Sequence, residues 1–438
     1  MSRPTVAFAT LGCRLNQVDT HELQDTLEAR GFRTVPFDSP ADVVIVNTCT
    51  VTARADFSDR QMIRRAGRVS PGARIVVTGC WAQTSPAAVA GVPGVDLVVG
   101  NGDKHRLPEL LLDLVERERG EAAIHVDGLG TSPAPPPLPV GPAAGHSRAF
   151  VKAQDGCQHR CAFCVVPLAR GMSRSRDVDF VVDRVGALVA AGHPEIVLTG
   201  VDLGHYGADL VPRTTLAALL RRLVEIAGLR WIRMSSTLPA YFTPDLLDVV
   251  TGSAVIAPHL HIPLQSGSDR VLRRMRRPYT VAMYRTLVER LANAIPRLGL
   301  GADVIAGFPG ETDADFAETL AVVEALPLTY LHVFPYSDRP GTEAARLECR
   351  PAASVVTDRA RQLRALSAAK NLAFRRGLID RTEDVLTLHT RDRRTARLVG
   401  LTGNYVEVSF EGGDELRGAM TRVRVTGATA STTQGMLA

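Results

Sequence analysis

Three cysteines in the middle of the chain, Cys157, Cys161 and Cys164, form a Cys-x3-Cys-x2-Cys motif, the central triplet. Three thiolates can hold three irons of a [4Fe–4S] cluster, and complete ligation by protein needs a fourth. No fourth cysteine follows at a ferredoxin-like spacing, so one iron is left open for a small molecule. The alternatives are a zinc site or a group of buried thiols, but zinc usually takes four ligands in paired Cys-x2-Cys or Cys/His spacings. The central triplet therefore favours an iron–sulfur cluster with an open coordination position.

Three more cysteines, Cys13, Cys49 and Cys80, form the amino-terminal triplet. Each follows an apolar, strand-like run after two or three intervening residues. The carboxyl ends of parallel strands meet at one edge of a sheet, where open α/β sheets bind ligands. A single buried cysteine is ordinarily a core residue, but three at equivalent positions are expected to converge. They predict a second [4Fe–4S] cluster, so that all six cysteines are expected to be metal ligands.

The bulk composition narrows the class of protein. A chain of 438 residues is too long for one compact core and predicts two or three domains. Seven cysteines in a chain of this size do not make a disulfide scaffold. The longest uncharged run, between Arg74 and Asp96, is interrupted by Pro86 and Pro93, so no membrane-spanning helix is predicted. The chain opens on no charged-then-apolar signal stretch, and a reducing, iron-supplying cytoplasm is the expected location.

The predicted fold class is α/β, and it begins with an amino-terminal domain over residues 1–130. Strand and helix patterns alternate there and predict a parallel sheet covered by helices. The strand-like runs are residues 6–9, 43–46, 74–77 and 97–99. Residues 131–146 carry six prolines among small residues, which predicts a semi-rigid, exposed linker.

Residues 147–372 predict a second α/β domain, a partial TIM-like barrel with its chemistry at the carboxyl ends of the strands. Six strand-like runs, at residues 149–151, 195–198, 231–234, 259–262, 302–305 and 330–333, are mostly separated by helical patterns such as residues 215–226 and 313–326. A helix-like stretch, residues 358–376, leads into a terminal domain over residues 373–438. Short strands at residues 384–389, 396–401, 405–410 and 422–425 predict a small β-barrel. The tail, residues 428–438, is expected to be frayed.

With six cysteines and three domains in this order, the chain resembles the radical S-adenosylmethionine (SAM) methylthiotransferases over nearly its whole length. That family comprises an amino-terminal cluster domain, a radical SAM barrel and a terminal RNA-associated β-barrel called TRAM. The resemblance implies that the open iron of the central triplet holds the amino and carboxylate groups of SAM. It also implies that Phe163, directly before the last cysteine, packs against the adenine of SAM.

The loop around Cys13 distinguishes the branches of this family. Its sequence, Thr-Leu-Gly-Cys-Arg-Leu-Asn-Gln at residues 10–17, is similar to that of the branch acting on threonylcarbamoyladenosine in tRNA. The isopentenyladenosine branch typically has Gly-Cys-Gln-Met-Asn there, and the ribosomal protein S12 branch has Gly-Cys-Pro-Lys-Asn. Residues 169–176 also favour the first branch, whereas Leu238 stands where that branch often has Glu before Pro239.

The resemblance implies a reaction that uses two [4Fe–4S] clusters and SAM. The central cluster, once reduced, cleaves SAM to a 5′-deoxyadenosyl radical, and the amino-terminal cluster carries the sulfur. One SAM methylates that sulfur, and a second activates the C–H bond at carbon 2 of the adenine beside the anticodon. The implied partners are tRNA, a reductant protein such as flavodoxin or ferredoxin, and a sulfur donor. The alternatives are the two sister reactions and, outside the enzymes, an iron–sulfur RNA-binding sensor or electron carrier, a role that an open iron and a glycine-rich cofactor pocket suit poorly.

Residues at the predicted strand ends of the central domain are interpreted as the cofactor pocket. They are Thr199, Gly200, Ser235, Ser236, Gln265 and Asp303. Glycine at position 200 lets the backbone approach the methionine end of SAM, and the two serine hydroxyls can bond ribose hydroxyls. Four histidines show no ligand spacing and are expected to be ordinary: His159, His193, His205 and His332.

Four arginines of the terminal domain are candidates for contacting tRNA: Arg391, Arg393, Arg394 and Arg397. Such clusters neutralise phosphates and steer RNA without carrying sequence information. The alternative is a solvated basic face. The net charge of +5 is modest for a nucleic-acid binder, but the distribution of the charge matters more. The best-exposed of these arginines are expected to make the contacts.

Overall fold

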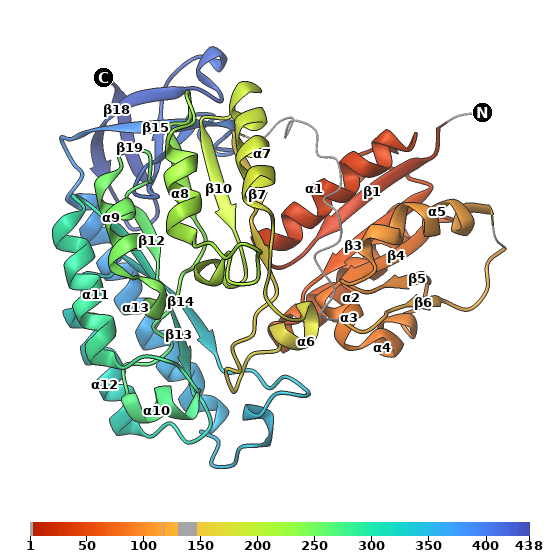
Figure 1. The fold of residues 1–438 in the computed structure, drawn as a ribbon, viewed down its shortest axis with the longest axis horizontal. Coiled ribbons are helices and arrows are strands. Elements are labelled where there is room, and N and C mark those ends of the chain that lie inside the picture. Colours follow the sequence, from red (N-terminus) through yellow and green to blue (C-terminus); the bar gives the residue numbers. More distant parts are fainter. Residues whose placement is uncertain (1–2, 117, 130–146) are drawn as a thin grey trace. The chain divides into compact units, whose positions relative to one another are not determined.

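The computed structural model describes residues 3–116, 118–129 and 147–438, which form two compact units (Figure 1). The first unit contains the described residues of Met1–Gly141 together with Gln154–Ser175 and Ser337–Ala345. The second unit contains those of Pro142–Ala153 together with Arg176–Tyr336 and Arg346–Ala438. The predicted linker, residues 131–146, lies outside the described residues. Both cysteine triplets therefore belong to the first unit.

The first unit is built on a six-stranded parallel sheet with the strand order β2-β1-β3-β4-β5-β6. The strands are β1 (Thr5–Thr10), β2 (Arg33–Thr34), β3 (Val43–Thr48), β4 (Arg74–Gly79), β5 (Val95–Val99) and β6 (Ala123–His125). The helices are α1 (Arg14–Ala29), α2 (Ala53–Val69), α3 (Cys80–Thr84), α4 (Pro86–Ala90) and α5 (Leu107–Glu116). Val44 and Val46 pack in one apolar core, and Val43 and Ile45 pack in another. Both faces of the sheet are covered, as continuous apolar strands require, and the predicted parallel α/β domain is confirmed.

A separate segment of the first unit carries the central triplet. Strand β8 (Gln154–Asp155) pairs antiparallel with β9 (Arg174–Ser175), and the cysteine loop and helix α6 (Val166–Arg170) lie between them in the chain. Helix α6 contacts α3, the short helix that begins at Cys80. The segment is therefore attached to the sheet edge at which the amino-terminal triplet lies.

The second unit contains the six strands predicted for the barrel, in two three-stranded parallel halves with the orders β11-β10-β7 and β12-β13-β14. The strands are β7 (Arg148–Lys152), β10 (Glu195–Thr199), β11 (Trp231–Met234), β12 (His259–His261), β13 (Gly299–Ala306) and β14 (Tyr330–Pro335). The main helices are α7 (Val178–Ala190), α8 (Leu216–Val224), α9 (Pro244–Gly252), α10 (Asp269–Arg274), α11 (Val281–Ala294), α12 (Asp313–Ala325) and α13 (Ala353–Arg376). Strands alternating with covering helices confirm the predicted α/β barrel (Figure 1).

The barrel strands alternate between an apolar outer face and a polar inner face. On β13, Leu300, Ala302 and Val304 join the large apolar core, in which residues of the strands and of the surrounding helices pack together. Asp303 lies between them in sequence and, because side chains of a strand alternate, points to the opposite face. The inner face of this barrel is thus available for polar chemistry.

The longest described helix, α13, lies against the second half of the barrel. Its Arg359 forms ion pairs of 2.7 Å with Glu311 and with Asp313, in the loop and helix that follow β13. The predicted helix over residues 358–376 is confirmed and starts five residues earlier, at Ala353. Among the described residues, no helix is long and apolar enough to cross a membrane.

The terminal domain is a closed barrel with the strand order β15-β16-β17-β19-β18. Its strands are β15 (Thr382–Arg391), β16 (Leu398–Thr402), β17 (Glu407–Phe410), β18 (Met420–Ala428) and β19 (Thr433–Leu437). The four predicted strands are confirmed.

The prediction of a frayed tail over residues 428–438 was wrong. Strand β19 pairs with both β18 and β17 and so closes the barrel. Arg375 donates to the carbonyls of Thr432 and Ala430 at 3.1 and 3.0 Å and so anchors the turn before β19. The tail is ordered because barrel closure satisfies its backbone groups, a long-range effect that its weakly patterned sequence does not announce.

Candidate iron–sulfur and cofactor sites

The structure brings the three cysteines of the amino-terminal triplet together at one edge of the parallel sheet. Cys13 lies between β1 and α1, Cys49 directly follows β3, and Cys80 begins α3 directly after β4. Because β1, β3 and β4 are neighbours in the sheet, their carboxyl ends deliver the three thiols to the same place. The negative charge of each of Cys13 and Cys80 raises the pKa of Cys49, which agrees with this proximity.

Glycines next to the amino-terminal cysteines leave room that no other residue would leave. Gly12 has φ +94°, and a Cβ atom there would lie 2.6 Å from Cβ and 2.7 Å from Sγ of Cys49. Gly79 has φ +100°, and a Cβ atom there would overlap the backbone of Thr48. Both positions therefore require glycine, for conformation and for space. Gly12 thus lets the backbone before Cys13 approach Cys49, and Gly79 lets the backbone before Cys80 approach Thr48.

Burial makes two of the amino-terminal thiols, Cys49 and Cys80, poor thiolates on their own. Burial is the main cause that raises the pKa of Cys49, to about 12. Burial also raises the pKa of Cys80, against the opposing effect of Arg170. Cysteine binds metals as the thiolate, so metal binding must release these protons. A donor set of two buried cysteines and the exposed Cys13 fits an iron cluster, whose positive irons compensate the thiolate charge.

The central triplet lies in a loop that its own backbone holds in shape. The Cys157 N–H donates to the carbonyl of Gly171 at 2.9 Å, and the Cys164 N–H donates to the carbonyl of Cys161 at 3.1 Å. Gly156 has φ +71°, and a Cβ atom there would overlap the carbonyl of Met172. Cys157 is buried, whereas Cys161, Cys164 and the neighbouring Phe163 are half-buried. The loop presents three sulfurs within eight residues, as ligation of three irons requires.

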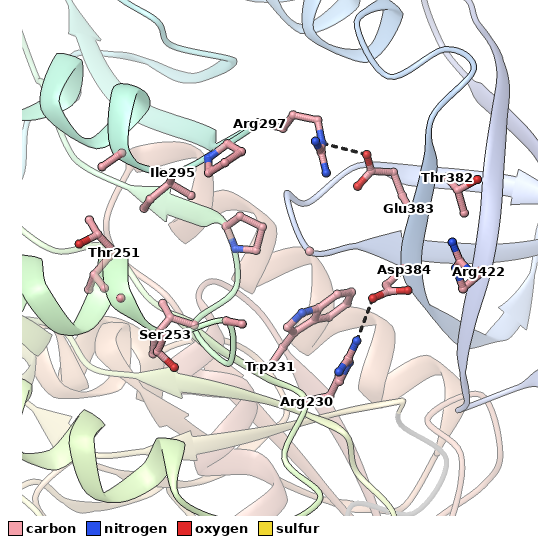
Figure 2. A pocket seen from close by; sticks show the side chains of 18 residues that line it. Arg230, Trp231, Thr251, Ser253, Ile295, Arg297, Thr382, Glu383, Asp384 and Arg422 are labelled. Atoms are coloured by element: carbon pink, nitrogen blue, oxygen red, sulfur yellow. Dashed lines mark hydrogen bonds and ion pairs between the residues drawn. The ribbon is translucent and has the colours of Figure 1, made fainter.

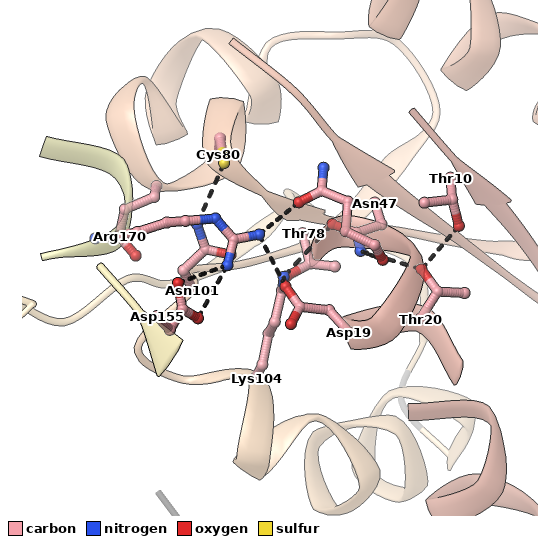
Figure 3. Close-up of polar contacts among 12 residues, drawn as sticks. Thr10, Asp19, Thr20, Asn47, Thr78, Cys80, Asn101, Lys104, Asp155 and Arg170 are labelled. Atoms are coloured by element: carbon pink, nitrogen blue, oxygen red, sulfur yellow. Dashed lines mark hydrogen bonds and ion pairs between the residues drawn. The ribbon is translucent and has the colours of Figure 1, made fainter. Parts of the chain in front are cut away.

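A buried arginine that the sequence did not single out connects the two cysteine loops (Figure 3). Arg170 donates to Asn16 at 2.6 Å and to Asp19 at 3.0 Å, both on helix α1, which begins beside Cys13. It also donates to both carboxylate oxygens of Asp155, at 2.9 and 3.0 Å, two residues before Cys157. Arg170 is therefore a strut between the two triplets.

Two further polar side chains complete this network. Lys104 forms an ion pair of 2.6 Å with Asp19, so that two cations face the carboxylates of Asp19 and Asp155. Burial opposes the charge of Arg170, but Asp155 and Asp19 raise its pKa well above the ordinary value. Asn101 donates to the carbonyl of Ala169 at 2.7 Å and lies 3.7 Å from the sulfur of Cys80. Charges buried this deeply are stable only as a satisfied set.

In the second unit, four of the predicted cofactor residues lie at the carboxyl ends of β10 and β11: Thr199, Gly200, Ser235 and Ser236. The Thr199 hydroxyl is buried and donates to the carbonyl of Val151 at 3.2 Å. The Ser235 hydroxyl bonds the N–H and the carbonyl of Gly200, both at 3.1 Å, and so fixes the backbone at the end of β10. Ser236 is half-buried beside it. Ser235 is thus engaged in shaping the strand end, and both serines are half-buried.

Gln265 follows β12 and has an unusual conformation. Its φ is +64°, and its backbone N–H donates to the carbonyl of Asp303 at 2.7 Å. Its side-chain Oε1 is buried and has no hydrogen-bond partner among the described residues. Buried polar atoms are nearly always satisfied, and strained backbone gathers at functional sites. Gln265 therefore fits a group that binds a ligand.

The carboxylate of Asp303 is engaged by two histidines and is therefore not open to a cofactor. Its Oδ1 accepts from His261 at 2.9 Å and lies 3.3 Å from Nδ1 of His332. Burial raises the pKa of Asp303, but hydrogen bonds from the two histidines outweigh it and leave the pKa well below the ordinary value. The sequence spacing gave no reason to single out His332, but β12, β13 and β14 bring these three residues together from distant parts of the sequence. Their donor atoms lie within 4.8 Å of one another, a set that could hold a metal ion.

A pocket of about 730 Å³ opens at the other end of the same strands, beside the terminal barrel (Figure 2). Two ion pairs cross it, Arg297 with Glu383 at 3.0 Å and Arg230 with Asp384 at 2.9 Å. It lies next to the start of β11, at Trp231. In barrels of this kind the chemistry lies at the carboxyl ends of the strands, and the opposite end serves stability. The pocket is therefore part of the packing interface between the central barrel and the terminal barrel of the second unit.

The four candidate arginines of the terminal barrel fall into two pairs. Arg391 forms an ion pair of 2.6 Å with Asp414, and Arg397 forms one of 2.8 Å with Glu411. Arg393 and Arg394 are exposed in the turn between β15 and β16. The structure thus leaves Arg393 and Arg394 as the accessible pair.

Comparison with known proteins defines the class. Residues 151–323 match the radical SAM superfamily, and residues 5–100 match a family described as uncharacterized protein family UPF0004. Among solved structures, the radical SAM methyltransferase TsrM from Kitasatospora setae has a similar fold, with a TM-score of 0.59 and 19% identity over 79% of this chain and 77% of TsrM. The fold and the match of the central domain define a radical SAM enzyme, which uses SAM and a [4Fe–4S] cluster.

Relatives that align over nearly the full length narrow the family. The threonylcarbamoyladenosine tRNA methylthiotransferase MtaB of Bacillus subtilis (strain 168) is 39% identical over 96% of this chain and 93% of its own length. The protein of the same name from Aquifex aeolicus (strain VF5) is 38% identical over 96% of this chain and 100% of its own length. A tRNA-2-methylthio-N(6)-dimethylallyladenosine synthase of Frankia casuarinae is 39% identical over 89% of this chain and 73% of its own length. The chain belongs to the family of radical SAM tRNA methylthiotransferases.

Proposed function

We propose that this protein inserts a methylthio group at carbon 2 of N6-threonylcarbamoyladenosine at position 37 of tRNA, beside the anticodon. The observation that carries the proposal is its similarity to two threonylcarbamoyladenosine enzymes over 96% of the chain. The loop around Cys13, residues 10–17, supports the same branch of the family.

We infer that the chain binds two [4Fe–4S] clusters, one on each cysteine triplet. The support is chemical: each triplet offers three sulfurs and no fourth, and each is bordered by a glycine that leaves no room for a side chain. When bound, these groups supply a radical derived from SAM and the sulfur to be inserted. The chain holds the two loops rigid, and Arg170 ties them together through Asp19 and Asp155.

The residues proposed to contact SAM are those that the family resemblance implies. Phe163 is proposed to pack on its adenine. The other proposed contacts come from strand ends of the central domain: Thr199, Gly200, Ser236 and Gln265. Ser235 supports the Gly200 backbone through two hydrogen bonds. The unpaired Oε1 of Gln265 is the atom best suited to accept a hydrogen bond from the cofactor.

The proposed function implies partners and a location. The substrate is tRNA, and the exposed pair Arg393 and Arg394 is proposed to contact its phosphates. A reductant protein such as flavodoxin or ferredoxin supplies electrons, and a separate donor restores the sulfur. Because tRNA and iron supply meet there, the cytoplasm is the proposed location.

The test is mass spectrometry of tRNA nucleosides from a strain that lacks this gene. The strain should lose the methylthio form of threonylcarbamoyladenosine while keeping its unmodified precursor, and complementation with the wild-type gene should restore the product. Any methylthio-isopentenyladenosine should be unchanged. Loss of the precursor together with the product would point to an earlier step and contradict the proposal.

A second candidate is methylthiolation of isopentenyladenosine. It is favoured by the 39% identity to the dimethylallyladenosine enzyme of Frankia casuarinae. The same experiment separates the two, because the second function requires loss of methylthio-isopentenyladenosine with methylthio-threonylcarbamoyladenosine unchanged.

A further inference from the structure

The inner face of the second half-barrel carries a row of five polar side chains, called the ladder below, which are linked by hydrogen bonds and an ion-pair contact. Nε2 of His259 lies 2.8 Å from the hydroxyl of Tyr330, and that hydroxyl lies 3.2 Å from Nδ1 of His261. Nε2 of His261 then donates to Asp303 at 2.9 Å, and Nδ1 of His332 lies 3.3 Å from the same carboxylate oxygen. All five side chains come from β12, β13 and β14. None of them is required by the cysteine sites.

The His259 end of this ladder is fixed by the terminal barrel, within the same unit. Tyr405 stacks on His259 with ring centroids 4.4 Å apart, and Arg233 lies over the Tyr405 ring at 4.9 Å. Arg233 is completely buried and forms an ion pair of 2.8 Å with Glu195. Tyr405 has φ +70°, a conformation that its surroundings must impose. Tyr405 therefore fixes the position of His259, which bonds Tyr330, and Tyr330 in turn bonds His261.

The His332 end of the ladder is exposed to solvent. The side chain of His261 is 11% exposed and that of Asp303 is 22% exposed, whereas that of His332 is 57% exposed. Phe334, two residues further along β14, is also exposed, and its ring meets His332 edge-on at a centroid distance of 6.5 Å. The exposed end thus offers an imidazole that a carboxylate holds in orientation, beside an aromatic ring.

This arrangement suits a polar group and rejects an apolar one. A ligand placed on His332 covers a polar ring and a carboxylate, and it must replace the water that they lose. The threonylcarbamoyl group carries a carboxylate, a hydroxyl and urea N–H groups, which can bond an imidazole in either role. An isopentenyl group offers no hydrogen bond, and a site built to bond a polar substituent discriminates strongly against an analogue that lacks it.

We propose that His261, Asp303 and His332 form the specificity site for the N6 substituent of the target adenosine, with His332 bonding its polar head group. The inference rests on the proposed function and deepens it, because it names the part of the substrate that the site selects. His332 is the residue that touches substrate, Asp303 and His261 are positioning residues, and Tyr330 and His259 support them. A metal ion on the same three side chains is the competing assignment, and it would have to displace both histidine contacts to Asp303.

The test compares the affinity of the holoenzyme for two anticodon stem-loop RNAs that differ only in the threonylcarbamoyl group on adenosine 37. The wild type should bind the modified RNA more tightly. His332→Phe should weaken binding of that RNA by about 10- to 100-fold, the range expected for losing a hydrogen bond to a charged group. It should leave the affinity for the unmodified RNA and the iron content unchanged. His332→Gln, which keeps a hydrogen-bonding side chain, should lose less than His332→Phe.

The matched control is a histidine substitution in the first unit, away from the ladder. His125→Phe, on the edge strand β6 of the first unit, should preserve the discrimination between the two RNAs. A His332→Phe enzyme with normal iron content and undiminished discrimination would overturn the inference while the proposed function stands. A stoichiometric metal other than iron, present in the wild type and absent from His332→Phe, would assign the three side chains to metal binding and would also overturn it. A wild-type enzyme that fails to methylthiolate the modified tRNA would instead remove the proposed function.

Discussion

The two cysteine triplets offer the same three ligands but are built in different ways. The central triplet comes from one loop, whose shape depends on local hydrogen bonds and on Gly156. The amino-terminal triplet is assembled from the ends of β1, β3 and β4, so it exists only when the parallel sheet has formed. A local motif can be recognised from spacing, whereas an assembled one depends on topology. Because the two sites depend on different parts of the fold, a substitution can disable one and leave the other intact.

The largest expected effect separates the two triplets by product. Cys161→Ala should abolish both 5′-deoxyadenosine formation and sulfur insertion, because the central cluster loses a ligand that nothing replaces. Cys49→Ala should abolish sulfur insertion but leave some 5′-deoxyadenosine formation. Both products can be measured in one anaerobic assay by liquid chromatography and mass spectrometry. Cys349→Ala, a change outside both triplets, is the control and should behave as the wild type. Methylthiolation at the normal rate by Cys49→Ala would refute separate roles.

The next effect concerns the strut between the triplets. Arg170→Ala should lower the free energy of unfolding of the first unit by about 3–5 kcal/mol, because it removes the buried cation that forms ion pairs with both Asp19 and Asp155. Arg170→Lys should recover only part of this, since a lysine cannot bridge both carboxylates. Denaturation can be followed by the fluorescence of Trp81, which is buried in the first unit, in a Trp231→Phe background.

The control for the strut is an exposed ion pair. Arg221→Ala, which removes a surface partner of Asp245 in the second unit, should leave this transition where it is. If Arg170→Ala also left the transition unmoved, the buried network would not hold the two loops together.

The smallest effect leaves both triplets intact and acts on the RNA. Arg393→Ala combined with Arg394→Ala should raise the apparent KM for tRNA and flatten the salt dependence of binding, because two phosphate contacts are lost. Filter binding at several salt concentrations measures both changes. Arg361→Ala, an exposed arginine on α13 paired with Asp358, serves as the control. A double variant with normal affinity at low and at moderate salt would reduce this turn to a solvated basic face.

Local signals in the sequence predicted much of the fold. The strand-like runs at residues 6–9, 43–46 and 74–77 place the amino-terminal cysteines at strand ends, and the structure has strands there. The strands of the second unit were predicted for the same reason, because buried parallel strands appear as short apolar runs. For the candidate sites, the sequence predicted the two cysteine triplets, because these depend on cysteine spacing and on strand ends.

The rest depends on contacts between distant residues. Strand β19 is stabilised by closing a barrel and by Arg375, and its own residues lack a clear alternation. Arg170 lies in a motif that marked the branch, but its partners Asn16 and Asp19 are far away in the sequence. His332 acquires its neighbours only when β12, β13 and β14 align. Side-chain networks of this kind are a product of topology, which periodicity does not encode.

The most direct test of the central claim, that each triplet holds its own cluster, is an iron count. Anaerobic reconstitution of the wild type should load about eight irons per chain, four for each triplet. Cys157→Ala and Cys13→Ala should each remove about half of that iron, and the double variant should bind almost none. A wild-type protein that loads only about four irons, or a Cys13→Ala protein with the full wild-type load, would contradict the account.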